Sequence, residues 1–174
     1  GEKGLLYTTA QFSDYSLKLD FRSAAGTNSG IFLSTVPNPT DVTTECYELN
    51  IAGSDNPFPT GSLVQRKKVE GDHRSDGWQS YEVQVEQGEV TVKLDGEPIL
   101  AYTDPTALRR GHIGLQLNEG KVEFRNVKLK PLGLAKIFNG KDLTGWKTYP
   151  DMESEFTVTE DGDLNVKNGR GQLE

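Results

Sequence analysis

The sequence predicts an all-β protein in which two antiparallel sheets pack face to face as a sandwich. Apolar and polar residues alternate strictly in many short stretches of the first 130 residues, which is the signal of strands buried on one side. The 19 glycines, 8 prolines and single methionine among 174 residues are typical of short strands joined by tight turns. Long helical periodicity is absent from the sequence. Since many one-sided strands must bury their apolar faces against one another, a two-sheet sandwich is the simplest architecture.

The strands of the first hundred residues are predicted from alternation and from the turns between them. In YSLKLDF, residues 15–21, apolar side chains occupy every second position. QSYEVQVEQGEVTVKLDGEPILAY, residues 79–102, contains three such runs separated by Gln87-Gly88 and Asp95-Gly96, and two-residue turns of this kind connect adjacent antiparallel strands. This segment is therefore predicted to be a β-meander.

The rest of the chain continues the pattern with one exception. Residues 104–110 are expected to form one or two turns of helix, with Asp104 as the cap and Pro105 at the first helical position. GHIGLQLNEGKVEFRNVKLKPL, residues 111–132, predicts a hairpin that turns at residues 118–120, and FTVTEDGDLNV, residues 156–166, predicts a second hairpin. Chains below about 40 residues seldom fold alone, so residues 134–174 are expected to pack against another part of a sandwich.

Charge and hydropathy argue against two classes of partner. The net charge of −7 and the pI near 4.9 oppose binding to nucleic acid, whose phosphates are normally met by clustered Lys and Arg. No apolar run approaches the roughly 18 to 20 residues that cross a bilayer, so no membrane span is expected. Cys46 is the single cysteine, and no intrachain disulfide can form.

Polar residues on several predicted strands identify a candidate binding face, because ligands collect where polar side chains converge on a concave surface. In CYELNI, residues 46–51, Glu48 and Asn50 share the face opposite the apolar residues. The same argument groups His112, Gln116 and Asn118 in HIGLQLN, and Asn28, Gly30, Phe32 and Ser34 in TNSGIFLS. Carboxylate and amide groups suit sugar hydroxyls, and a single glutamate suits a general base. The simpler interpretation is that Glu48 and His112 are solvated surface residues.

FNGKDLTGW, residues 138–146, and IGLQLNEGKVEFRN, residues 113–126, resemble the family of 3-keto-disaccharide hydrolase domains, which share the concanavalin A-like jelly-roll sandwich. In that family the order of elements begins with a phrase like FNGKDLTGW and ends with one like IGLQLNEGKVEFRN, whereas here the order is rotated. Residues 1–6 also resemble residues 168–173, GEKGLL against NGRGQL. The resemblance therefore implies that residues 1–133 form the main part of one sandwich and that residues 134–174 are the opening strands of a second tandem copy.

We expect these opening strands to complete the same sandwich. Two routes stay open, namely completion within one chain, as in a circular permutation, and exchange between molecules, which would give a domain-swapped homodimer. Either route predicts that Phe138 and Trp146 are buried against strands of residues 1–131.

The resemblance implies a carbohydrate partner and a particular reaction. A ketone at C3 of a sugar acidifies the hydrogen at C2, so that a base can remove it and the group at C1 can leave. Glu48 matches the glutamate of the family's Tyr-Glu-x-Gln pattern and is the candidate base. An expected histidine and an expected arginine of the family are absent, and Arg66 or Arg125 could take the place of the arginine.

Two functions remain open from the sequence. The first is a hydrolase or lyase that acts on 3-keto-glycosides or related sugars, and the second is a non-catalytic, lectin-like module of a larger protein. Both imply a secreted or periplasmic location. No residues have the spacing of a zinc site or a calcium loop and no cofactor is evident, while a requirement for a divalent metal stays open together with the identity of the sugar.

Overall fold

The computed structural model describes residues 3–174 and divides into two compact units, residues 1–133 and Leu134–Glu174. Gly1 and Glu2, which begin the element repeated at residues 168–173, lie outside the described residues. Among residues 3–174 every regular element is a strand, and no helix is long and apolar enough to cross a membrane. The helical turn expected at residues 104–110 does not form. Asp104 instead closes a tight turn by accepting a hydrogen bond from the Thr106 amide at 2.8 Å.

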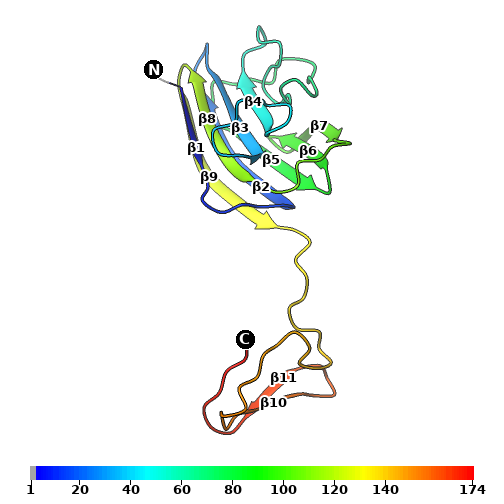
Figure 1. The fold of residues 1–174 in the computed structure, drawn as a ribbon. Helices are drawn as coiled ribbons and strands as arrows, with labels where there is room; N and C mark the ends of the chain where they lie inside the picture. Colours follow the sequence, from blue (N-terminus) through cyan, green and yellow to red (C-terminus); the bar gives the residue numbers. More distant parts are fainter. Residues whose placement is uncertain (1–2) are drawn as a thin grey trace. The chain divides into compact units, whose positions relative to one another are not determined.

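The first unit is a sandwich of two antiparallel sheets (Figure 1). Four strands form one sheet, in the order β1 (Gly4–Tyr7), β8 (His112–Glu119), β3 (Asn28–Thr35) and β4 (Tyr47–Ala52). Five strands form the other, in the order β7 (Glu97–Thr103), β6 (Glu89–Leu94), β5 (Gln79–Glu86), β2 (Tyr15–Ser23) and β9 (Val122–Pro131). Neighbouring strands pair antiparallel throughout both sheets, as the alternation predicts.

The core lies between the two sheets and is built from alternate positions of their strands. On β2 the apolar residues of YSLKLDF are at most 1% exposed, and on β4 Tyr47, Leu49 and Ile51 are fully buried. Burial of apolar side chains contributes roughly 25 cal/mol per Å² of surface removed from water, so these layers supply the main driving force for the fold. The prediction of an all-β two-sheet sandwich is confirmed.

The two turns of the meander have the geometry that their residues predict. Gln87 and Gly88 have φ values of 50° and 89°, and Asp95 and Gly96 have values of 53° and 89°. A type I′ turn requires positive φ at both central residues, and its twist matches that of the flanking strands. These turns join β5, β6 and β7 in the predicted order.

The second unit contains the other predicted hairpin. In it β10 (Glu155–Val158) pairs antiparallel with β11 (Leu164–Lys167), so that Phe156 lies opposite Val166. Phe138 and Trp146 are each half-buried. That residues 134–174 complete a sandwich stays a prediction.

Candidate functional site

Two rows of residues cross the outer face of the four-stranded sheet, the face turned away from the core. Strand register places Glu48 on β4 opposite Phe32 on β3, and Phe32 opposite Gly114 on β8. In the adjacent row Asn50 lies opposite Gly30, and Gly30 lies opposite Gln116. The register therefore brings Glu48, Asn50 and Gln116 together on one face, as alternation along the separate strands predicts.

Gly30 leaves the space that the Glu48 side chain occupies. A Cβ atom at residue 30 would lie 3.2 Å from Cγ and 3.3 Å from Oε1 of Glu48, closer than most real Cβ contacts. The Glu48 carboxyl group consequently reaches across β3 toward β8, where Gln116 stands. The absence of a side chain on the middle strand thus allows groups from the two flanking strands to approach each other.

The Glu48 side chain is a buried carboxyl group without a counter-ion. Glu48 is 8% exposed, and no ion pair involves it among residues 3–174. Burial raises the pKa of the Glu48 carboxyl, and hydrogen bonding with the Gln116 side chain partly opposes that rise. A carboxylate with a raised pKa is a stronger base than an exposed one, which is a property suited to proton abstraction.

The two amides beside Glu48 retain unused hydrogen-bonding capacity. The Asn50 Nδ2 group donates to the Phe58 carbonyl oxygen, while Asn50 Oδ1 is buried and has no hydrogen-bond partner among the described residues. Gln116 Oε1 is likewise buried without a partner in this part of the chain. Buried acceptors without a partner are rare in folded proteins. Each one lowers the stability of the fold until a donor reaches it. A sugar hydroxyl group is such a donor.

An open groove of about 290 Å³ adjoins these rows. Its lining includes Leu5 from β1, Phe32 from β3, and Gln116 and Asn118 from β8, together with Lys3 and Asn38. Phe32 and Gln116 each belong to one of the two rows and also line the groove, whereas Glu48 and Asn50 do not line it. An aromatic ring flanked by amide groups and an amine can contact both the apolar and the hydroxyl-bearing surfaces of a sugar.

Asn28 and His112 lie at the ends of the same face. Asn28 is the first residue of β3 and is half-buried opposite Ala52. His112 begins β8 and is 7% exposed, with its Nδ1 atom 2.6 Å from the Thr8 carbonyl oxygen and its Nε2 atom 3.2 Å from Gln11 Nε2. Both ring nitrogens of His112 therefore contact the segment that follows β1, and the structure does not bring this imidazole to Glu48.

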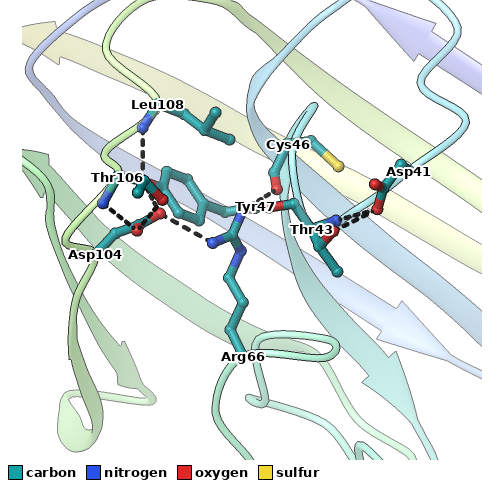
Figure 2. A network of polar contacts seen from close by, with 8 residues as sticks. All are labelled: Asp41, Thr43, Cys46, Tyr47, Arg66, Asp104, Thr106 and Leu108. Atoms are coloured by element: carbon teal, nitrogen blue, oxygen red, sulfur yellow. Dashed lines mark hydrogen bonds and ion pairs between the residues drawn. The ribbon is translucent and has the colours of Figure 1, made fainter.

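Arg66 contacts the side chain of Tyr47 (Figure 2). Tyr47 precedes Glu48 on β4, so its side chain points to the opposite face of the strand. The Arg66 Nη1 atom is 2.9 Å from Asp104 Oδ2, its Nη2 atom donates to the Thr43 carbonyl oxygen at 2.6 Å, and its guanidinium carbon lies 4.5 Å from the centre of the Tyr47 ring. The Arg66 and Asp104 side chains are only 7% and 2% exposed.

The Tyr47 hydroxyl closes this network by donating to Asp104 at 2.9 Å and accepting from the Leu108 amide at 2.9 Å. Burial raises the pKa of Tyr47 to about 12, so its hydroxyl stays a proton donor. Arg125 is equally remote from Glu48, because it pairs with Asp20 at 3.1 Å on the other sheet. Neither arginine reaches the candidate base.

A family model for the 3-keto-alpha-glucoside-1,2-lyase-like domain matches residues 1–130, which include every residue of the two rows and of the groove. The chain belongs to this family. No curated protein matches the chain significantly.

Solved structures share the fold of this lyase-like domain at low sequence identity. A predicted glycosyl hydrolase from Parabacteroides distasonis is 20% identical, with a TM-score of 0.64 over 75% of this chain and 84% of that one. A second such protein from the same organism is 20% identical, with a TM-score of 0.62 over 72% and 75% of the two chains. The carbohydrate-binding module CBM66 from Bacillus subtilis is 14% identical, with a TM-score of 0.60 over 74% and 81%. These similarities establish the fold.

Sequence reasoning missed several features of the lyase-like domain. Lys3, Leu5 and Asn38 line the groove but carry no local signal, because they come from two separate parts of the chain and meet β8 only in the fold. Ser34 was expected beside Phe32, yet its φ of 51° and a register shift between β3 and β8 interrupt the alternation before this residue. Among residues 3–174, no group of three or more His, Cys, Asp or Glu side chains is arranged to hold a metal ion.

Proposed function

We propose that the outer face of the four-stranded sheet binds a 3-keto-glycoside and that Glu48 acts as the general base of an elimination reaction. The observation that carries this proposal is the state of Glu48, a buried carboxyl group with a raised pKa. In the part of the chain that the structure describes, Glu48 has no counter-ion and lies beside two amides with unpaired oxygens. Membership of the lyase-like family and a fold shared with predicted glycosyl hydrolases support it. A secreted or periplasmic location suits such a substrate, and we infer it for this protein.

The reaction needs a base at C2 and a stabilised leaving group at C1. Glu48 removes the C2 proton, which the C3 ketone has made acidic, and the electron pair of that bond is delocalised onto the ketone oxygen. The electrons return to form the C1–C2 double bond while the C1–O bond breaks. The departing aglycone oxygen takes up a proton from water, and Glu48 returns the C2 proton to solvent. Asn118 and Lys3 supply hydrogen-bond donors in the adjoining groove, while the unpaired oxygens of Asn50 and Gln116 accept from sugar hydroxyls.

A second function is favoured by the positions of Arg66 and His112. Both side chains are held by other partners, so neither an arginine nor an imidazole accompanies Glu48. The same face would then bind sugar without catalysis, and the fold is one that a carbohydrate-binding module also has. The groove and the two amides would bind sugar in either function. The two functions differ only in whether Glu48 removes a proton.

Aglycone release distinguishes the two functions. The protein would be incubated with a chromogenic aryl 3-keto-glucoside, and calorimetry would measure binding of the same sugar. We expect release by the wild type, loss of release in Glu48→Gln, and unchanged release in Glu97→Gln, in which the substituted residue is an exposed glutamate of β7. Binding without release would assign the module function, and absence of both would reject the proposal.

A further inference from the structure

The segment between β3 and β4 turns back over the outer face of the four-stranded sheet. β3 ends at Thr35, where β8 begins, whereas Gln116 and Asn118 lie toward the other end of β8. Asn38 nevertheless lines the same groove as Gln116 and Asn118. The chain therefore reverses after Thr35, and residues 36–39 form one wall of the groove.

The wall is held in place by Glu45, which stands at the other end of the same segment. Its Oε2 atom accepts hydrogen bonds from the Asp41 amide at 2.9 Å, from the Thr40 amide, and from the Thr40 hydroxyl at 3.3 Å. The Val36 amide donates to the Glu45 carbonyl oxygen at 3.1 Å and closes the base of the segment. The amides of Asp41 and Thr40 favour the charged carboxylate, so they hold the pKa of Glu45 below its ordinary value of 4.5.

Asn38 occupies a restricted backbone position at the tip of the wall. Pro37 and Pro39 flank it, and the ring of each proline fixes its own φ. Asn38 has a φ of 51°, in the left-handed region that Asn adopts more readily than most residues. Its side chain is exposed, so its amide is available to a ligand in the groove. A ligand that binds this amide orders little additional chain, which favours affinity.

The groove lies beside the position of the reacting sugar ring. Glu48 and Asn50 do not line the groove, whereas Gln116 belongs both to it and to the row that contains Asn50. In the proposed reaction Glu48 takes the proton from C2, and the leaving group is attached to the neighbouring C1. A sugar ring above Glu48 can therefore extend its leaving group past Gln116 into the groove.

We propose that the groove is the aglycone subsite and that Asn38 selects aglycones that carry hydroxyl groups. Glu45 is the positioning residue, because it holds the wall that presents the Asn38 amide. This inference rests on the proposed function and deepens it by naming the class of leaving group.

Calorimetry in the Glu48→Gln background, which should bind without reacting, tests the selection. The two ligands are a 3-keto-glucoside with a glucose aglycone and phenyl 3-keto-glucoside. Asn38→Gly permits the same φ and removes the amide, so it should weaken binding of the first ligand about fivefold more than binding of the second. Asn126→Gly is the matched control, because Asn126 is exposed with a φ of 52° but lies on β9 of the other sheet. It should change neither affinity.

The positioning role of Glu45 has a readout that needs no sugar. Amide hydrogen exchange of Thr40 and Asp41 should be slow in the wild type and fast in Glu45→Ala, which removes the acceptor of both amides. Glu45→Ala should also reduce the preference for the glucose aglycone. Glu45→Gln, which keeps a side-chain oxygen at this position, should largely restore both properties.

Three results would overturn the inference. Equal effects of Asn38→Gly on the two ligands would show that Asn38 does not select the aglycone. Fast exchange of Thr40 and Asp41 in the wild type would show that Glu45 does not hold the wall. Failure of both ligands to bind would reject the sugar-binding face itself, and the aglycone subsite with it, even if these amides exchange slowly.

Discussion

The two sides of β4 hold buried polar groups in opposite states. On the inner side the Tyr47 hydroxyl, the Asp104 carboxylate and the Arg66 guanidinium contact one another, and Arg66 Nε is the atom of this group left without a partner among the described residues. On the outer side, within residues 3–174, Glu48 has no counter-ion and the side-chain oxygens of Asn50 and Gln116 have no hydrogen-bond partner. Satisfied buried networks fix a fold, whereas unsatisfied ones cost stability and persist where a ligand completes them. We therefore ascribe a structural role to the inner side, and the binding role proposed above belongs to the outer side.

The largest expected effect comes from breaking the inner network. Asp104→Ala would leave the Arg66 guanidinium buried without a counter-charge, and removal of one partner of a buried ion pair costs about 3–5 kcal/mol. Urea denaturation should report this loss as a lower midpoint with little change in slope. Binding of sugar by the fraction that remains folded should be unaffected, because the network lies on the far side of β4.

A second ion pair supplies the control for this measurement. Arg74 and Asp76 are joined at 2.8 Å, but the Asp76 side chain is 88% exposed. Asp76→Ala should therefore change the midpoint little, because exposed pairs contribute little to stability. Equal losses in the two variants would contradict the structural role given to the inner network.

The next variant should lose function without losing stability, the opposite of Asp104→Ala. Glu48→Gln keeps the shape of the side chain and removes a charge whose burial is unfavourable, so the free energy of unfolding at neutral pH should stay unchanged or rise. Aglycone release should nevertheless be lost. A variant that is both inactive and clearly less stable than wild type would place Glu48 with the structural residues.

Opposite pH dependences separate the two carboxyl groups. The pKa of folded Glu48 is raised above its ordinary value of 4.5, so the folded state binds the proton more tightly, and stability falls as the pH rises from about that value through the folded pKa. For Asp104, burial acts to raise the pKa, but hydrogen bonds from Thr106 and Tyr47 and the Arg66 charge together lower it below 3.8. Its contribution is lost as the pH falls below 3.8 through the folded pKa.

Denaturation curves between pH 3 and pH 8 measure these slopes. We expect Glu48→Gln to remove the fall in stability above about pH 4.5 and to leave the loss at lower pH in place. A slope above this pH that persists in Glu48→Gln would mean that another group is responsible for it.

The features that the sequence predicts correctly are those that depend on near neighbours along the chain. Alternation places Glu48 and Asn50 on one face because side chains of a strand point to alternate sides. It cannot identify the inner network, because Asp104 meets Arg66 and Tyr47 across 38 and 57 positions. These distant partners occupy the Asp104 carboxylate, and the helix that it was expected to cap does not form. The space above Gly30 depends in the same way on the register of three strands.

The smallest expected effect tests this space directly. Gly30→Ala would place a methyl group 3.2 Å from Glu48 Cγ, so the carboxyl group must shift by a few tenths of an ångström. We expect a modest loss of aglycone release or sugar affinity, larger than any change in the denaturation midpoint, because the shift displaces Glu48 from Gln116 while the core stays intact. Gly77→Ala is the matched control, since its nearest contact would be an ordinary 3.6 Å to Ser75 Oγ and its φ is not positive. Equal effects of the two substitutions on sugar binding would show that Gly30 does not position Glu48.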